Sequence, residues 1–159
     1  MICTTSGRIR FIKMALRDWV AEEHLVRLLS ANPAIARCAR LEAEGGADVT
    51  VALHGRREVL IECKNVLRGT TADGAYRLDF QRTRASKRDA CSRYYQPSDF
   101  QVVAACLHPQ LEHWQFRFAL TQDMDRLVDG ECVGRLRPNV RLDARWSDDA
   151  VAILERLSP

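Results

Sequence analysis

The amino-acid sequence predicts an α/β fold contained in a single domain. Three observations predict it: an early apolar stripe at helical spacing, two neighbouring strand-like runs, and two further strand-like runs after a basic segment. The chain has 159 residues and 47% hydrophobic content, which is enough to bury one core. We expect one domain over residues 1–159, with its core at residues 16–121 and a C-terminal extension at residues 122–159.

The core is expected to begin with a helix over residues 15–30, where apolar positions recur at steps of three and four residues. This stripe consists of Leu16, Trp19, Val20, Val26 and Leu29. Glu23 falls within the stripe on a helical wheel, and Glu22 lies nearer its edge. A glutamate on an apolar face either extends into water or points into a site, and the angle favours Glu23 over Glu22 for the second role.

Two charged residues share one face of a strand that is predicted to be buried. Residues 48–53 and 59–65 are expected to form largely buried β-strands joined by a turn. Side chains alternate between the faces of a strand, so Glu62 and Lys64 emerge on one face and Cys63 on the other. A buried carboxylate or ammonium is destabilising by several kcal/mol unless it is paired or binds a metal. The pair therefore indicates a functional site.

Asp48, Glu62 and Lys64 supply the groups that a metal-dependent phosphodiesterase requires. Carboxylate oxygens suit Mg²⁺, which commonly takes one or two ligands from protein and the others from water and substrate phosphate. Asp48 and Glu62 fit that role. A lysine beside the metal either positions or deprotonates the attacking water, and it stabilises the charge that develops on the phosphorane.

These three residues and their strands resemble the core motif of the PD-(D/E)xK nuclease superfamily. The resemblance covers roughly residues 16–121. It implies a restriction-endonuclease-like fold, with an α-β-β-β-α-β-β core whose mixed central sheet is flanked by helices. Ala47 occupies the position of the proline in the motif's name, where superfamily members vary freely. The missing proline makes the motif harder to identify in the sequence, but it removes none of the groups that act in catalysis.

The same resemblance implies the composition of the active site. Mg²⁺ is the expected cofactor, with Mn²⁺ as a substitute, and the backbone carbonyl of Cys63 is a further ligand beside Asp48 and Glu62. Many members carry an acidic residue on the helix before the motif strand, which makes Glu23 a candidate accessory metal ligand. Many also place a glutamine on the helix after the E-x-K strand, which Gln81 matches in type and order. The expected catalytic residues are Asp48, Glu62, Lys64 and Gln81.

Residues 76–95 are expected to form that second helix, which crosses back over the sheet. The segment contains six basic and two acidic residues. An isolated cluster of this kind is usually a solvated face, but beside a phosphodiesterase site it suits the DNA backbone. Tyr94 and Tyr95 either stack on bases or pack in the core, and packing is favoured. The expected DNA-binding residues are Arg82, Arg84, Lys87 and Arg88, with Arg84 and Lys87 foremost.

The remaining elements complete the order of one helix, three strands, a second helix and two strands. Residues 35–43 are the weakest of the predicted strands, and residues 99–108 have the continuous apolar pattern of a central strand. Residues 113–121 alternate as a strand with one exposed face, after a turn at Pro109. A final helix is expected near the C-terminus, with Ser147 as its cap.

Six cysteines and four histidines show no C-x-x-C or H-x-x-x-H spacing, so neither a zinc cluster nor a disulfide framework is expected. Cys63 and Cys106 are predicted to be small buried hydrophobes. No stretch approaches the ~20 apolar residues of a membrane span, and charged residues interrupt any signal-peptide pattern near the start. We expect a soluble, cytoplasmic protein that has no membrane partner.

Together these features predict a Mg²⁺-dependent DNA endonuclease that hydrolyses phosphodiesters in the manner of restriction enzymes. Two alternatives stay open: a catalytically inactive DNA-binding module of the same fold, and a junction-resolving or exonuclease member of the superfamily. Because each chain is expected to carry one site, a two-fold homodimer is the simplest way to cut both strands. Partner proteins of a defence or repair system are compatible with this prediction.

Overall fold

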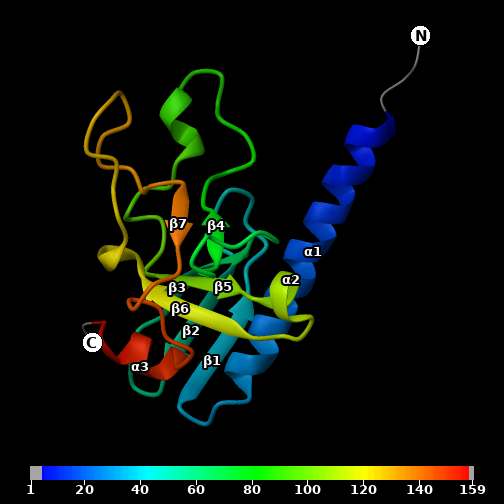
Figure 1. The fold of residues 1–159 in the computed structure, drawn as a ribbon. Helices are drawn as coiled ribbons and strands as arrows, with labels where there is room; N and C mark the ends of the chain where they lie inside the picture. Colours follow the sequence, from blue (N-terminus) through cyan, green and yellow to red (C-terminus); the bar gives the residue numbers. More distant parts are fainter. Residues whose placement is uncertain (1–4, 158–159) are drawn as a thin grey trace.

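Five strands form a mixed sheet at the centre of the molecule, in the order β1-β2-β3-β5-β6 (Figure 1). The computed structural model describes the backbone of residues 5–157 and the side chains of residues 12–157. The strands are β1 (Ile35–Arg40), β2 (Val49–Leu53), β3 (Val59–Asn65), β5 (Val102–Cys106) and β6 (Phe116–Leu120). β3 and β5 are parallel, and the other neighbouring pairs are antiparallel. A mixed sheet flanked by helices confirms the predicted fold class.

The first helix, α1 (Thr5–Ser30), is longer than the helix predicted over residues 15–30, and it projects past the sheet (Figure 1). Its buried residues Ala21, Leu25 and Leu29 recur one turn apart. Leu16 and Trp19, which were predicted to share the buried stripe, are 59% and 46% exposed. That prediction was wrong for these two residues: α1 projects past the sheet (Figure 1), and the Trp19 ring lies 5.6 Å from the guanidinium carbon of Arg40 on β1 rather than in the apolar core.

The helix predicted over residues 76–95 is not found there. The segment contains instead β4 (Arg77–Asp79), which pairs antiparallel with β7 (Asn139–Arg141), and a 3₁₀-helix, η1 (Ala90–Arg93). Leu78 and Phe80 are both buried, and their spacing of two residues is that of a strand. Asp89 accepts a hydrogen bond from the Cys91 N–H at the start of η1. Local side-chain bonds of this kind favour turns over a continuous helix.

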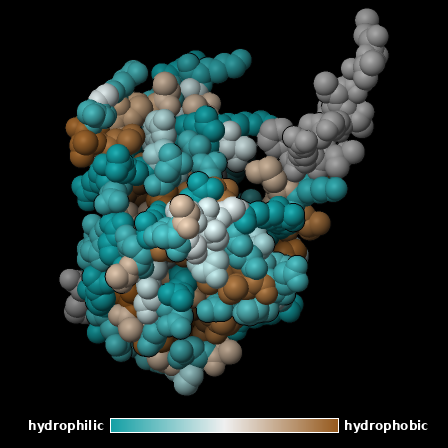
Figure 2. Space-filling view, viewed as in Figure 1, coloured by the Kyte–Doolittle hydropathy of each residue, from teal (hydrophilic) through white to brown (hydrophobic). Residues whose placement is uncertain are grey.

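The two faces of the sheet are covered differently. α1 and the C-terminal helix α3 (Ala150–Glu155) pack their apolar side chains against one face. β4, η1, β7 and their connecting loops, at residues 67–95 and 122–146, form a lobe whose apolar side chains pack against the other. Figure 2 shows a mainly hydrophilic surface in this view, with a hydrophobic patch on the outermost loop of the lobe, where Val128 and Val133 are exposed.

The last helix is capped by a different residue from the one predicted. Asp149 Oδ1 accepts a hydrogen bond from the Ala152 N–H, whereas Ser147 forms a backbone bridge with Phe118 of β6. Asp149 is nearer the helix, so its carboxylate reaches a free N–H of the first turn. Two short elements, α2 (His108–Leu111) and η2 (Thr121–Asp123), flank β6. No helix among the described residues is long and apolar enough to cross a membrane.

A disulfide joins Cys91 to Cys132, contrary to the expectation that the cysteines form none. The two residues are 41 positions apart, on segments of the lobe that only the fold brings together, so their spacing gave no sign of the bond. Cys63 and Cys106 are buried free cysteines, as predicted. Burial raises the pKa of both thiols, which suits packing rather than reactivity.

Loss of the disulfide is expected to destabilise the protein. Cross-linking residues 41 positions apart stabilises a fold by roughly 2–4 kcal/mol, because it restricts the unfolded chain. Differential scanning calorimetry of the Cys91→Ser/Cys132→Ser variant should show a Tm lower by roughly 10 °C. Cys38→Ser, which removes a free cysteine on β1, is the matched control. An unchanged Tm in the double variant would show that the lobe does not depend on this bond.

Candidate metal centre

Asp48 immediately precedes β2, and two hydrogen bonds to β3 bring it beside Glu62. The Asp48 N–H donates to the Ile61 carbonyl at 3.1 Å, and Asp48 Oδ2 accepts from the Cys63 N–H at 2.8 Å. Asp48 therefore contacts the residues on both sides of Glu62. The first bond extends the antiparallel pairing of β2 with β3 by one residue, and the second holds the Asp48 carboxylate against β3.

The Glu62 carboxylate has one satisfied and one unsatisfied oxygen. Glu62 is only 3% exposed. Its Oε1 accepts a hydrogen bond from the Tyr95 hydroxyl at 2.5 Å and pairs with Lys64 Nζ at 3.1 Å. Its Oε2 is buried and has no hydrogen-bond partner within the described part of the chain. A buried polar oxygen without a partner is unfavourable by several kcal/mol, so an added cation would be stabilised there.

Lys64 lies on the same face of β3 as Glu62, as the strand alternation predicts. Its Nζ also lies 5.4 Å from the centroid of the Tyr95 ring. Burial acts to lower the pKa of Lys64, but the charge of Glu62 and the other neighbours outweigh it, so the pKa is raised. Lys64 is therefore a cation, which favours an electrostatic or positioning role over that of a base.

Asp48 has the opposite tendency, toward the neutral form. Burial, reinforced by the charge of Glu62, raises the pKa of Asp48 to about 8, and the hydrogen bond from Cys63 offsets only part of this. Two carboxylates that interact in this way repel each other when both are ionised. A divalent cation bound by both would relieve that repulsion.

A third carboxylate, that of Glu22 on α1, lies near enough to Asp48 to act on its charge. The charge of Glu22 helps to raise the pKa of Asp48, and the pKa of Glu22 is itself raised, chiefly by burial and further by Glu62. Arg40 on β1 pairs with both glutamates: its Nε lies 3.2 Å from Glu23 Oε1, and its Nη1 lies 3.6 Å from Glu22 Oε2. Contact with Arg40 therefore does not distinguish the two glutamates, and Glu23 stays a candidate accessory ligand.

The oxygen donors fit a hard divalent cation that takes few ligands from protein. Carboxylate oxygens are the ligands that Mg²⁺ and Mn²⁺ prefer, and Glu62 Oε2 is a buried acceptor with no other described partner. Among the side chains of residues 12–157, no three His, Cys, Asp or Glu groups lie close enough to hold a metal alone. This arrangement suits Mg²⁺, which keeps several waters and adds substrate phosphate oxygens.

A cleft of about 470 Å³ opens at Lys64, between α1 and the lobe. Its basic lining residues are Arg17, Lys64, Arg68, Arg82 and Arg93. Its acidic lining residues are Asp18 and Asp79. Lys64, which pairs with Glu62, connects this cleft to the carboxylates, and the surplus of positive charge in the cleft would attract an anion such as a phosphate backbone.

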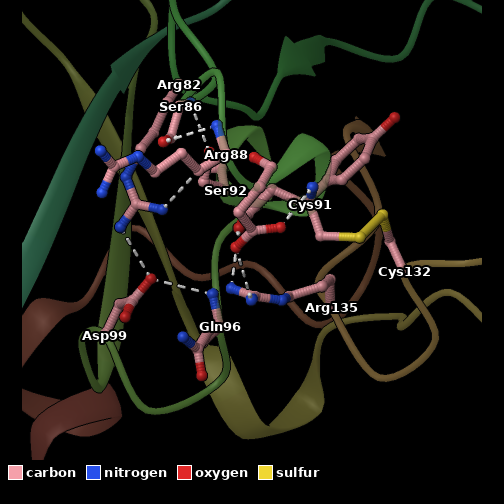
Figure 3. Close-up of polar contacts among 11 residues, drawn as sticks. Arg82, Ser86, Arg88, Cys91, Ser92, Gln96, Asp99, Cys132 and Arg135 are labelled. Carbon is pink, nitrogen blue, oxygen red and sulfur yellow. Dashed lines mark hydrogen bonds and ion pairs between the residues drawn. A yellow bond between two sulfur atoms is a disulfide. The ribbon is translucent and has the colours of Figure 1, made fainter.

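Gln81 reaches this cleft although it is not on a helix, so the prediction was wrong about its element. It follows β4, and its Nε2 donates to Asp79 Oδ1 at 2.8 Å. Arg82 also lines the cleft, but its guanidinium pairs with Asp99 at 3.0 Å inside the lobe (Figure 3). The other predicted DNA contacts, Arg84, Lys87 and Arg88, are exposed on the loop that precedes η1.

Tyr95 is the site residue that sequence reasoning did not identify. Its ring packs in the core of the lobe, as predicted, and is only 4% exposed. Its hydroxyl meets Glu62, which is 33 positions away in the sequence. Only the adjacency of two tyrosines marks this position, and that pattern does not indicate which element the hydroxyl will reach.

Comparisons with known proteins show similarity of fold. The chain matches the solved structure of a bacterial homing endonuclease, I-Ssp6803I, with a TM-score of 0.53 and 15% sequence identity. The match covers 81% of this chain and 77% of that chain. At this level of identity, the similarity establishes a shared α/β fold only. No protein-family model and no curated protein matches the sequence.

Replacement of Asp48 by Asn is expected to stabilise the metal-free protein at alkaline pH. Burial raises the pKa of Asp48 to about 8 in the folded protein, whereas an unfolded aspartate has a pKa of about 3.9. The neutral carboxyl therefore favours folding at low pH, and this contribution is lost as the pH rises from about 4 to about 8. Asn keeps an oxygen that can accept from the Cys63 N–H, and it carries no charge at any pH.

Thermal unfolding in EDTA measures this effect. At pH 4 the Tm of Asp48→Asn should be close to that of the wild type, and the difference should grow as the pH rises to 8, so that at pH 9 the variant melts roughly 10 °C higher or more. Asp148→Asn, which changes an exposed aspartate before α3, is the control and should show no such pH dependence. A variant that loses stability relative to the wild type as the pH rises would contradict repulsion at this site.

Proposed function

We propose that this protein is a Mg²⁺-dependent DNA endonuclease of the PD-(D/E)xK type. The observation that carries the proposal is the buried Glu62 Oε2, which has no partner among the described residues and lies in a carboxylate cluster with Asp48. Lys64 pairs with the other oxygen of Glu62 and lines a positively charged cleft. The shared fold with a bacterial homing endonuclease is consistent with nuclease chemistry.

In the proposed mechanism, Asp48 and Glu62 would hold Mg²⁺ or Mn²⁺, with the backbone carbonyl of Cys63 as a further ligand. The ion, when bound, polarises the phosphoryl oxygens as a Lewis acid. Lys64 orients the attacking water and stabilises the negative charge that develops on the phosphorane, as its cationic state allows. Gln81, on the wall of the cleft, supports the site.

We propose that DNA enters the cleft between α1 and the lobe. Arg17 and Arg68, which line the cleft, would meet the phosphates nearest the site. Lys87 and its basic neighbours on the exposed loop before η1 would contact the flanking backbone. Arg82 shares its charge with Asp99, so we expect it to contribute less than Arg84 and Lys87.

Cleavage of both strands favours a pair of active sites, and we propose a two-fold homodimer for this reason. Exposed apolar side chains on α1, such as Ile12 and Leu16, offer surface for a contact between copies. Restriction-type cleavage, junction resolution and exonuclease action would use the same residues. A partner protein of a defence or repair system would bind to this dimer, and the active site would still be formed by the residues of this chain.

The nuclease assay tests the proposed function. Purified protein with Mg²⁺ or Mn²⁺ should nick and then linearise supercoiled plasmid, and EDTA should stop the reaction. Lys64→Ala and Asp48→Asn should each reduce the rate by about 100-fold or more, while Asp148→Asn should cut at the wild-type rate. Cutting that survives both substitutions would remove the proposed mechanism.

The substrates in the same assay distinguish the alternative functions. Digestion of linear DNA from its ends alone would indicate an exonuclease, and a requirement for a four-way junction would indicate a resolving enzyme. Binding without cutting under any metal condition would favour the catalytically inactive module.

The exposed basic loop is expected to contribute phosphate contacts. Lys87→Ala should weaken binding to unrelated duplex sequences equally and reduce the slope of log K against log salt by about 0.9. Fluorescence anisotropy at several KCl concentrations, with Ca²⁺ in place of Mg²⁺, measures the slope. The control is Arg57→Ala, which changes an exposed arginine in the turn before β3, at the end of the strand opposite to Lys64. This variant should bind DNA as tightly as the wild type. A wild-type slope for Lys87→Ala would show that this loop lies away from DNA.

A further inference from the structure

A buried tyrosine distinguishes the two oxygens of Glu62. The Tyr95 hydroxyl donates at 2.5 Å to Oε1, the same oxygen that pairs with Lys64 Nζ at 3.1 Å. Oε2 has no hydrogen-bond partner in the described structure. We propose that Tyr95 is a positioning residue, which orients the Glu62 carboxylate so that Oε2 is presented to the metal. This inference rests on the proposed function, because it concerns the same metal centre.

Lys64 alone would orient Glu62 poorly. An ammonium on a flexible four-carbon stem is a point charge with rotatable donors, and it pairs about equally well with either carboxylate oxygen. A phenol hydroxyl donates one hydrogen bond from a rigid ring. In the bond to Glu62 Oε1 the hydroxyl is the donor, because a carboxylate oxygen accepts. The position of the ring therefore determines which oxygen of Glu62 is occupied.

The Tyr95 ring is held by its neighbours in the lobe. The ring centroids of Phe80 and Phe100 lie 4.9 Å and 5.2 Å from that of Tyr95. The guanidinium carbon of Arg82 lies 4.7 Å from the same centroid, within the range of a cation–π contact. Asp99 pairs with Arg82 at 3.0 Å and so fixes the guanidinium in this position (Figure 3). The ring has contacts that resist its rotation away from Glu62.

The backbone that carries Tyr95 is also tied to a second segment of the lobe. The Leu136 N–H donates to the Tyr95 carbonyl at 2.9 Å. The disulfide between Cys91 and Cys132 joins the preceding turn to the same outer loop (Figure 3). The hydroxyl is therefore carried by a cross-linked scaffold. Groups that hydrogen-bond to metal-ligating side chains act in this way when they fix the orientation of the ligand.

The variant Tyr95→Phe removes the hydroxyl and leaves the ring. We expect it to bind Mn²⁺ roughly 10- to 100-fold more weakly than the wild type, which is the usual effect of removing a partner of a metal ligand. The electron paramagnetic resonance signal of free Mn²⁺ measures this binding without DNA and without catalysis. Tyr94→Phe removes the same group from the adjacent residue and should bind Mn²⁺ as the wild type does.

A second readout separates positioning from a general loss of structure. In DNA cleavage, Tyr95→Phe should raise the Mn²⁺ concentration for half-maximal rate by the same factor, with a rate at saturating Mn²⁺ close to that of the wild type. A lower Tm with unchanged Mn²⁺ affinity would overturn the proposal, because Tyr95 would then be structural only. If the wild type itself binds no Mn²⁺, the proposed function fails; if only the effect of Tyr95→Phe is absent, this inference alone fails.

Discussion

The buried carboxylate of Glu62 is the constraint on which the architecture around it depends. It is carried by β3, which lies between β2 and β5 in the sheet, so water cannot satisfy both of its oxygens. Lys64 and Tyr95 share one oxygen, and the other has no described partner. An arrangement of this kind is unfavourable in isolation and becomes favourable when a cation is added. The unsatisfied oxygen lowers the stability of the metal-free protein, and it also provides a ligand that is already in place for a metal. Unsatisfied groups of this kind are common at functional sites.

The two layers on either side of the sheet contribute in different ways. α1 closes one face with Ala21, Leu25 and Leu29 and brings Glu22 toward the carboxylates. The lobe closes the other face, delivers the Tyr95 hydroxyl, and lines the cleft with basic side chains. The same loops thus carry the positioning group and the charges that would attract a phosphate backbone. The disulfide between Cys91 and Cys132 cross-links these loops, which include the segment where the sequence predicted a helix crossing the sheet.

Much of the sheet could be predicted from the sequence, because period-two alternation and buried apolar runs are local signals. β3 was predicted with its observed bounds, and the shared face of Glu62 and Lys64 followed from that alternation. The segment after β3 could not be predicted as reliably, because its leucine and arginines also fit a helical period. In addition, β4 pairs with β7, a strand that lies about 60 residues later in the chain. Tyr95 was assigned to the core correctly, but its contact with Glu62 depends on that long-range folding. Glu22 and Glu23 are adjacent on α1, and both pair with Arg40 on β1, a long-range contact that a helical wheel cannot show.

Crystallography with Mn²⁺ tests the metal centre most directly, because anomalous scattering identifies the ion and its ligands together. A peak is expected about 2.1 Å from Glu62 Oε2, with an Asp48 oxygen in the same coordination sphere and Oε1 still bonded to Tyr95. Absence of a peak at Glu62 in crystals soaked with saturating Mn²⁺, or a peak bound only by surface carboxylates elsewhere, would contradict the assignment of Asp48 and Glu62 as the metal ligands.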